Sequence, residues 1–146
     1  MIVKEKKIDP FIEWLVWGSL EPKTDLELIL LKGHLLLEKV IETVLNRYGI
    51  REIENYSFYK KIIELKKVVP HEIKNKDLII ESLIILNRLR NKLAHELDYE
   101  VENDDDFAEW FTNILASLKG RKWCKYTHRT KIVHSFSVLA INVLNM

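Results

Sequence analysis

The sequence predicts an all-α protein, an antiparallel bundle of about five helices, and three observations support this prediction. Glycine and proline number only 4 and 3 in 146 residues, too few for the many tight turns of an all-β sandwich. Apolar residues recur every three to four positions in several long segments without proline. The composition, 47% hydrophobic and 31% charged, is that of a globular chain burying roughly two thirds of its surface. We therefore expect a single helical domain over residues 1–146.

The N-terminal segment, residues 1–20, is rich in aromatic side chains near its end. Its apolar stretch consists of Phe11, Ile12, Trp14, Leu15, Val16 and Trp17. Aromatic side chains bury large apolar areas. We therefore expect this stretch to pack as a helical turn against a bundle formed by residues 21–146.

The longest helix is predicted over residues 24–47, which contain no proline. Either Thr24 or Asp25 can cap its start, and Gly49 can supply the left-handed residue that commonly ends a helix. The apolar positions at helical spacing are Leu26, Ile29, Leu30, Leu36, Leu37, Val40, Ile41, Val44 and Leu45.

Three further helices follow from the same periodicity. A short amphipathic helix is predicted over residues 57–69, because Pro70 ends it. A second is predicted over 76–94. The third, 104–118, begins with three consecutive aspartates, which favour a helix start, and we expect Gly120 to close it.

The last segment, residues 130–146, has a single charged residue, Lys131. Its mixture of Val, Ile, Phe and Leu is compatible with a helix or a strand. We predict a helix.

The charge and cysteine content restrict the classes of partner and compartment. Lys and Arg number 23 against 22 Asp and Glu, a net charge of +1, so any nucleic acid must be bound by a local patch. Cys124 is the only cysteine, which excludes an internal disulfide and a paired-cysteine zinc site. The sequence shows no signal peptide and no apolar run of bilayer length. We expect a soluble, cytoplasmic protein without a membrane partner.

The helix predicted over 76–94 carries an arginine where the pattern expects an apolar side chain. At about 100° per residue, one narrow stripe contains Ile79, Leu83, Leu86, Leu93 and Leu97. Arg90 falls in this stripe, where a guanidinium is costly to desolvate unless it is paired or reaches water or an anion. A second row contains Ile80, Ile84, Asn91 and His95. This row is also predicted to avoid bulk solvent, and it is available to contact a partner. Arg90 and His95 lie about 140° apart on an ideal helix.

Residues 86–95, LNRLRNKLAH, resemble the signature of HEPN domains, in which an arginine, usually a polar residue, and a histidine follow at short spacing. The resemblance extends to residues 33–39, GHLLLEK, and to residues 57–62, SFYKKI. It is nearest to the mannitol-repressor-like branch. It implies a helical bundle, usually a homodimer, in which the signatures of both subunits line a cleft. Many HEPN proteins are metal-independent endoribonucleases, some of them in toxin-antitoxin or antiviral defence settings.

The resemblance assigns a role to each residue of the signature. Cleavage by the RNA 2′-hydroxyl needs a proton acceptor near neutral pH and a cation for the developing phosphorane charge. His95 would take the first role and Arg90 the second, while Asn91 would orient His95 or bind the phosphate. No metal or other cofactor is implied. RNA, a second copy of the chain, and an antitoxin or regulatory protein are the expected partners.

A basic segment from residue 119 to residue 131 has no acidic residue and contains interleaved aromatic rings. Single-stranded RNA is bound by this combination of charge for phosphates and rings for base stacking. The candidate RNA-binding residues are Lys122, Trp123, Lys125, Tyr126 and Arg129. The alternative is a solvated basic loop that offsets the acidic residues nearby.

Structural interpretations of the same residues remain open. Arg90 can instead bridge to Glu38 or Glu42, with His95 stabilising the end of its helix. His34 and Glu38, four residues apart, can form a packing pair or join the site. The alternative function is a non-catalytic transcriptional regulator or protein-binding module of the mannitol-repressor type, or a silent accessory subunit.

Overall fold

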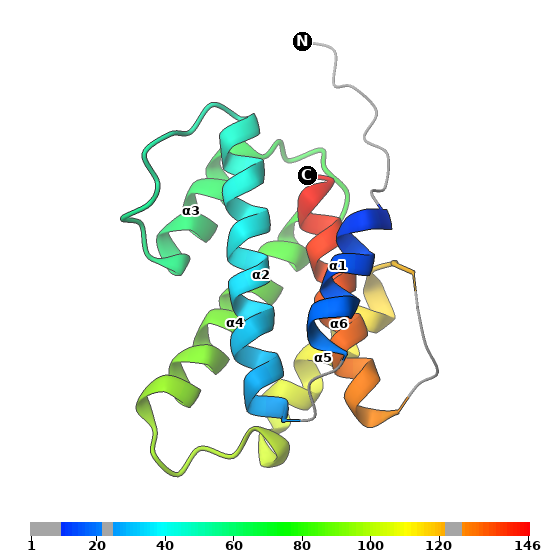
Figure 1. The fold of residues 1–146 in the computed structure, drawn as a ribbon. Coiled ribbons are helices and arrows are strands. Elements are labelled where there is room, and N and C mark those ends of the chain that lie inside the picture. The colour runs from blue at the N-terminus through cyan, green and yellow to red at the C-terminus, as the bar shows by residue number, and fades with distance from the viewer. Residues whose placement is uncertain (1–9, 22–24, 122–126) are drawn as a thin grey trace.

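The computed structural model describes residues 10–21, 25–121 and 127–146 of the chain, and these residues form helices and connecting loops (Figure 1). The elements are α1 (Pro10–Leu20), α2 (Leu26–Arg47), α3 (Phe58–Val68), α4 (Lys76–His95), the short 3-10 helix η1 (Val101–Asn103), α5 (Asp105–Ser117) and α6 (His128–Leu144). The predicted all-α class is confirmed. The described α-helices number six, since the aromatic N-terminal stretch forms a helix of about three turns instead of a single turn.

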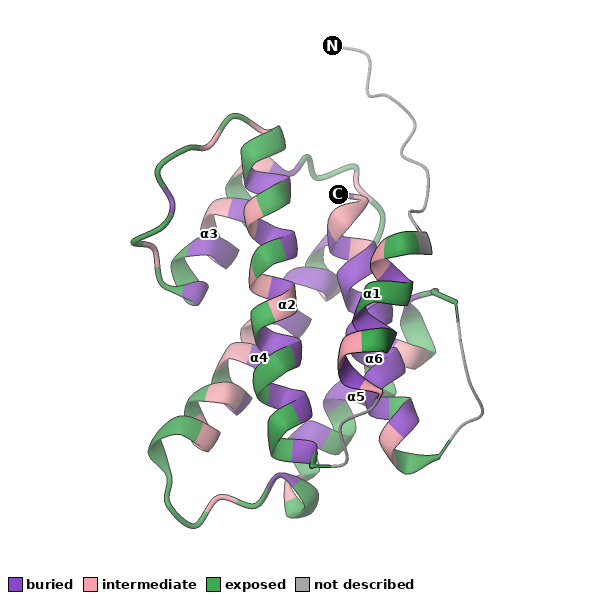
Figure 2. Ribbon diagram, viewed as in Figure 1, coloured by how far each residue is buried: buried purple, intermediate pink, exposed green. Residues whose placement is uncertain are grey.

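The core is organised around α6. Every side chain from Ile132 to Ile141 is buried, and α1, α2, α4 and α5 pack against this helix (Figure 2). A helix that is apolar on all sides is stable only when other elements cover it on all sides. The near absence of charge in residues 130–146 therefore reflects a central position in the bundle. The predicted C-terminal helix is confirmed.

Local capping sets the start and end of α2 and the start of α3. The Asp25 side chain accepts a hydrogen bond from the Glu27 N–H at 2.9 Å, and the Ser57 hydroxyl accepts one from the Lys60 N–H at 3.1 Å. Gly49, just beyond α2, has a φ of +86°, a left-handed conformation that glycine adopts without steric cost. The predicted boundaries of both helices agree with the structure to within two residues.

The end of α5 differs from the prediction. The helix ends at Ser117, and Leu118 follows in an extended conformation, its N–H bound to the Ile114 carbonyl at 2.9 Å. The extended backbone still buries the Leu118 side chain. Gly120 lies beyond this end and is not its cap, so that expectation is wrong. The end is set by burial of Leu118 and not by a glycine.

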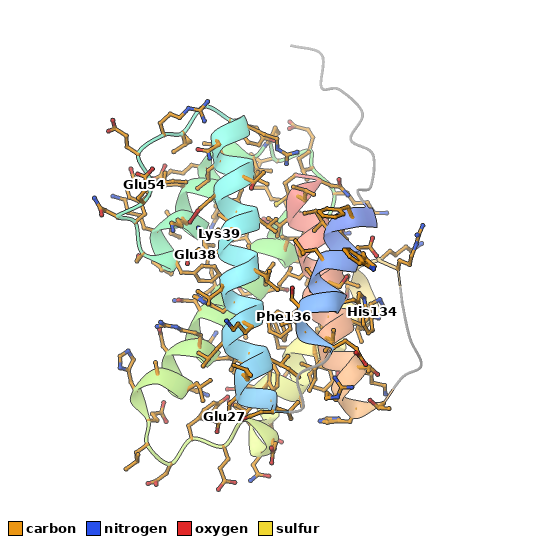
Figure 3. All side chains as sticks on the ribbon, viewed as in Figure 1. Glu27, Glu38, Lys39, Glu54, His134 and Phe136 are labelled. Carbon is orange, nitrogen blue, oxygen red and sulfur yellow. The ribbon has the colours of Figure 1, made fainter. Side chains whose placement is uncertain are left out.

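The packing of α2 on α6 depends on Gly33. A methyl group on Gly33 would lie 2.4 Å from two ring atoms of Phe136, which occupies the space between these two helices (Figure 3). Glycine therefore lets the two backbones approach closely around the aromatic ring.

The N-terminal helix α1 is held by one buried face. Val16, Trp17 and Leu20 are buried, and the Trp17 ring contacts the His134 ring of α6 with centroids 5.8 Å apart. Glu13, also buried, accepts a hydrogen bond from the backbone N–H of Arg121. Burial raises the pKa of Glu13. Among the described helices, none combines the length and apolar character that a bilayer crossing requires.

Candidate functional site

The signature residues lie at the C-terminal end of α4, where the helix leaves the core. The first four turns bury Ile79, Ile80, Leu83, Leu86 and Leu89, whereas the last residues, Ala94 and His95, are exposed. The signature is therefore on an accessible helix end and belongs only in part to the packed interior.

Two features predicted for this helix are wrong. Leu97, expected in the core stripe, is 100% exposed, because α4 ends at His95 and Glu96 is already extended. The second row also fails as a continuous protected face. Ile80 is buried in the same core as the first stripe, whereas Asn91 and His95 are exposed.

Arg90 is half-buried, and no carboxylate among the described residues forms an ion pair with it. Its Nη1 donates a hydrogen bond to the Asn91 side-chain oxygen at 3.4 Å, and no ion pair in the described part of the chain involves it. The predicted alternative, a bridge to Glu38 or Glu42, is wrong. Both carboxylates bind Lys61 of α3, each at 3.0 Å from its Nζ.

Lys61 is a residue that the sequence interpretation overlooked. Its side chain is only 4% exposed, and it lies three residues after Phe58 and four before Leu65, within the apolar stripe of α3. Burial opposes its charged form, but hydrogen bonds to Glu42 and Glu38 outweigh this effect and raise the pKa of Lys61. A lysine within an apolar stripe was the available signal, because such a charge requires partners.

His34 of α2 lies beside this cluster and is 5% exposed. Its ring contacts Phe58 with centroids 4.2 Å apart, and its Nε2 has no hydrogen-bond partner. Burial lowers the pKa of His34 to about 4, with a further contribution from the positive charge of Arg90. The imidazole is therefore neutral at neutral pH and is a packing residue. Glu38 binds Lys61 instead of His34.

His95, unlike His34, is exposed to solvent. Its side chain makes no hydrogen bond or ion pair with any other described residue, Arg90 and Asn91 included. It lines a shallow pocket of about 320 Å³ together with Glu27 from the first turn of α2. The ring is accessible to a ligand.

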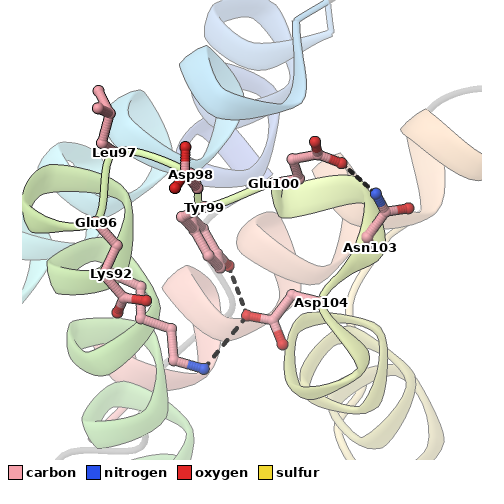
Figure 4. Close-up of a pocket in the computed structure, with 8 residues that line it drawn as sticks. All are labelled: Lys92, Glu96, Leu97, Asp98, Tyr99, Glu100, Asn103 and Asp104. Carbon is pink, nitrogen blue, oxygen red and sulfur yellow. Dashed lines mark hydrogen bonds and ion pairs between the residues drawn. The ribbon is translucent and has the colours of Figure 1, made fainter.

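A larger pocket of about 540 Å³ lies next to the signature, between the end of α4 and the start of α5 (Figure 4). The Tyr99 hydroxyl donates to the Asp104 carboxylate at 2.7 Å, and Lys92 Nζ lies 3.5 Å from the same group. Burial opposes ionisation of Asp104, but these contacts and its capping bond to the Asp106 N–H keep its pKa below the usual value.

Burial and the bond to Asp104 raise the pKa of Tyr99. The pocket lining also includes Glu96, Asp98 and Glu100. This excess of carboxylates repels phosphate. Within the signature, Lys92 is paired with Asp104 and Asp106, whereas the half-buried Arg90 forms no ion pair with a described carboxylate.

Of the five predicted RNA-binding residues, the structure describes only Arg129. Lys122, Trp123, Lys125 and Tyr126 lie outside the described residues. Arg129, in the first turn of α6, donates to the Glu21 carbonyl, and its Nη2 lies 3.4 Å from the Glu21 carboxylate. Its guanidinium connects α6 to the end of α1. Within the described ranges, no group of three or more His, Cys, Asp or Glu side chains is arranged to hold a metal ion.

Comparisons of the chain with protein-family models, with curated proteins and with solved structures find no significant match. The function is inferred below from the residues and their geometry.

Proposed function

We propose that this chain is a metal-independent endoribonuclease module in which Arg90, Asn91 and His95 act at a cleft between two copies. The observation that carries the proposal is the state of Arg90, a half-buried guanidinium that no described carboxylate neutralises. Such a charge is stabilised by an anion. Its neighbours on α4 supply an amide and an accessible imidazole.

The proposed reaction is transesterification within RNA. The 2′-hydroxyl gives its proton to His95 while its oxygen bonds to phosphorus and the bond to the 5′-oxygen breaks. The leaving 5′-oxygen takes a proton from water and His95 returns its proton to the solvent, so the products are a cyclic phosphate and a 5′-hydroxyl. Arg90 pairs with the oxygens that gain charge in the phosphorane, and Asn91 donates to the phosphate.

The proposal includes a second copy because Arg90 and His95 lie on different sides of the same helix. Arg90 and His95 are about 140° apart on an ideal helix, and no contact joins them. In a twofold dimer, Arg90 of one copy can meet His95 of the other copy, and the same pair forms a second time with the copies exchanged. An arginine and a histidine from different copies then contact the same phosphate.

The test is cleavage of a labelled structured RNA in EDTA by the wild type, Arg90→Ala and His95→Gln. We expect each variant to lose roughly 100-fold or more in rate. The matched controls are Arg88→Ala on the same helix and His71→Gln, both at exposed positions, and they should cleave like the wild type. Activity that survives in both signature variants would remove the assignment. An inactive wild type would favour the protein-binding alternative.

The shared cleft is tested by mixing the two inactive variants after partial unfolding and refolding. A heterodimer of Arg90→Ala and His95→Gln contains one intact site, so random mixing restores about a quarter of the wild-type activity. Light scattering at micromolar concentration should show a dimer. A monomer, or a mixture without activity, would contradict the arrangement between two copies.

A further inference from the structure

Exposed apolar side chains concentrate on one side of the molecule. Eight large hydrophobic residues of the described chain are exposed, and six of them lie on α1 or α2. These six residues, here called the α1–α2 face, are Phe11, Trp14, Leu15, Leu28, Leu31 and Leu35. Both helices have their exposed residues on the side that faces the viewer in Figure 2. Apolar clusters of this size usually mark interaction sites.

A groove runs between the two helices. One hollow of about 530 Å³ is lined by Gly18 and Leu35, and a neighbouring hollow of about 120 Å³ is lined by Leu15. Leu36 and Lys39 line both hollows, so the two are adjacent. A methyl group on Gly18 would meet no atom within 4 Å. The groove therefore has open space for side chains of a partner.

The charged side chains along this groove carry a net positive charge. Lys32 and Lys39 both line the larger hollow, and Lys32 forms no ion pair with a described residue. The Lys39 side chain is 80% exposed and lies 3.6 Å from Glu42. Glu38, the carboxylate in the lining, shares the buried Lys61 with Glu42, so Lys39 and Lys61 balance these two carboxylates and Lys32 adds the unbalanced positive charge. The groove therefore complements a partner that carries carboxylates.

An antiparallel second copy of this chain fits the face poorly. Lys32 and Lys39 are seven residues apart and lie along one edge of α2. A twofold axis that crosses two antiparallel α2 helices places the same edge of each copy on the same side, so the lysines of both copies would repel one another. An acidic partner converts the same lysines into attractive contacts.

We propose that the α1–α2 face binds an acidic amphipathic helix of another protein. Leucine or aromatic anchors of that helix would occupy the groove beside Leu15, Leu35 and Leu36, as in other helix-in-groove complexes. Lys32 and Lys39 are separated by about 10 Å along α2. Two carboxylates placed two turns apart on the partner would reach both. The proposal is independent of RNA cleavage, because the face lies on α1 and α2 and the signature on α4.

The test uses two fluorescent 18-residue peptides that share one leucine-rich helical face and differ in their flanking residues, glutamate in one and lysine in the other. Anisotropy titrations should show at least tenfold tighter binding of the acidic peptide to the wild-type chain. Lys32→Glu combined with Lys39→Glu should reverse this preference. Leu35→Asp should abolish binding of both peptides while RNA cleavage is unchanged. The control, Lys66→Glu with Lys67→Glu on exposed α3 positions, should bind like the wild type.

Thermal unfolding followed by circular dichroism shows that each variant is folded. The proposal is overturned if the acidic peptide does not bind the wild type at millimolar concentration, or if both peptides bind equally. It is also overturned if Leu35→Asp turns a wild-type dimer into a monomer, since a second copy would then occupy the face.

Discussion

His34 and Lys61 are both almost fully buried, and they meet the cost of burial in opposite ways. Lys61 keeps its charge because two carboxylates, Glu38 and Glu42, bind it. His34 has no partner at Nε2 and remains neutral, with its pKa lowered to about 4 by burial. The two residues therefore respond differently to pH and to substitution.

The His34 prediction concerns stability at acidic pH. The unfolded chain binds a proton at this residue near pH 6.5, whereas the folded chain does so only near pH 4. Between these values the unfolded state holds more protons, so the free energy of unfolding falls as pH falls. The loss attributable to His34 is about 3 kcal/mol at most. Urea denaturation between pH 7 and pH 4.5 should show a shallower dependence in His34→Gln than in the wild type or in His71→Gln. Identical slopes would contradict the lowered pKa.

Substitution of Lys61 should destabilise the fold through its partners. Lys61→Met leaves Glu38 without its cation and Glu42 with only the exposed Lys39, and we expect a loss of about 3 kcal/mol in the free energy of unfolding. Adding Glu38→Gln and Glu42→Gln removes the uncompensated charges and should recover most of this loss. Urea denaturation of the single and triple variants measures both effects. An equal loss in the triple variant would show that packing of the lysine stem dominates.

At the scale of elements, the contact between α2 and α6 rests on Gly33. Gly33→Ala places a methyl group within 2.4 Å of the buried Phe136 ring, and overpacking of this kind costs about 1–3 kcal/mol. The higher helix propensity of alanine offsets about 1 kcal/mol. We therefore expect a net destabilisation of up to about 2 kcal/mol in denaturant unfolding.

The matched control for this prediction is Gly18→Ala on α1, where the added methyl group meets no neighbouring atom. This variant should be as stable as the wild type or gain up to about 1 kcal/mol. Combining Gly33→Ala with Phe136→Leu should reduce the damage, because a smaller side chain makes room. A Gly33→Ala protein that gains as much stability as Gly18→Ala would contradict the close packing.

At the scale of the whole molecule, α6 supplies the surface on which four other helices pack. A chain that ends at Lys119 lacks this helix and exposes the apolar faces of α1, α2 and α5 to water. Because hydrophobic burial is the main force that opposes chain entropy, we expect no cooperative thermal transition by circular dichroism. A cooperative transition in this truncated chain would show that the core does not depend on α6.

The parts of the fold that follow from local sequence were predictable. Helical periodicity, the cap at Asp25, the left-handed Gly49 and the stop at Pro70 placed α2 and α3 to within two residues. Predictions that needed the helix to continue past its true end failed. The clearest case is Leu97, which ideal geometry placed in the core and which is fully exposed after α4 ends.

The candidate site was predictable only as a list of residue types. Arg90, Asn91 and His95 stand out in the sequence, and the structure adds that Lys61, on a different helix, binds the carboxylates expected to pair with Arg90. Nothing local to α4 reveals which cation binds Glu38 and Glu42, because ion pairing between helices depends on their packing.

The sequence by itself determined that this chain is helical, where most helices begin, and which polar residues cluster at the end of α4, because these properties arise from contacts within about four residues. The central place of α6, the uncompensated charge of Arg90 and the exposed α1–α2 face were decided only by the tertiary structure. Each of these depends on which helix covers which, and that is set by competition among apolar faces of similar character distributed along the whole chain.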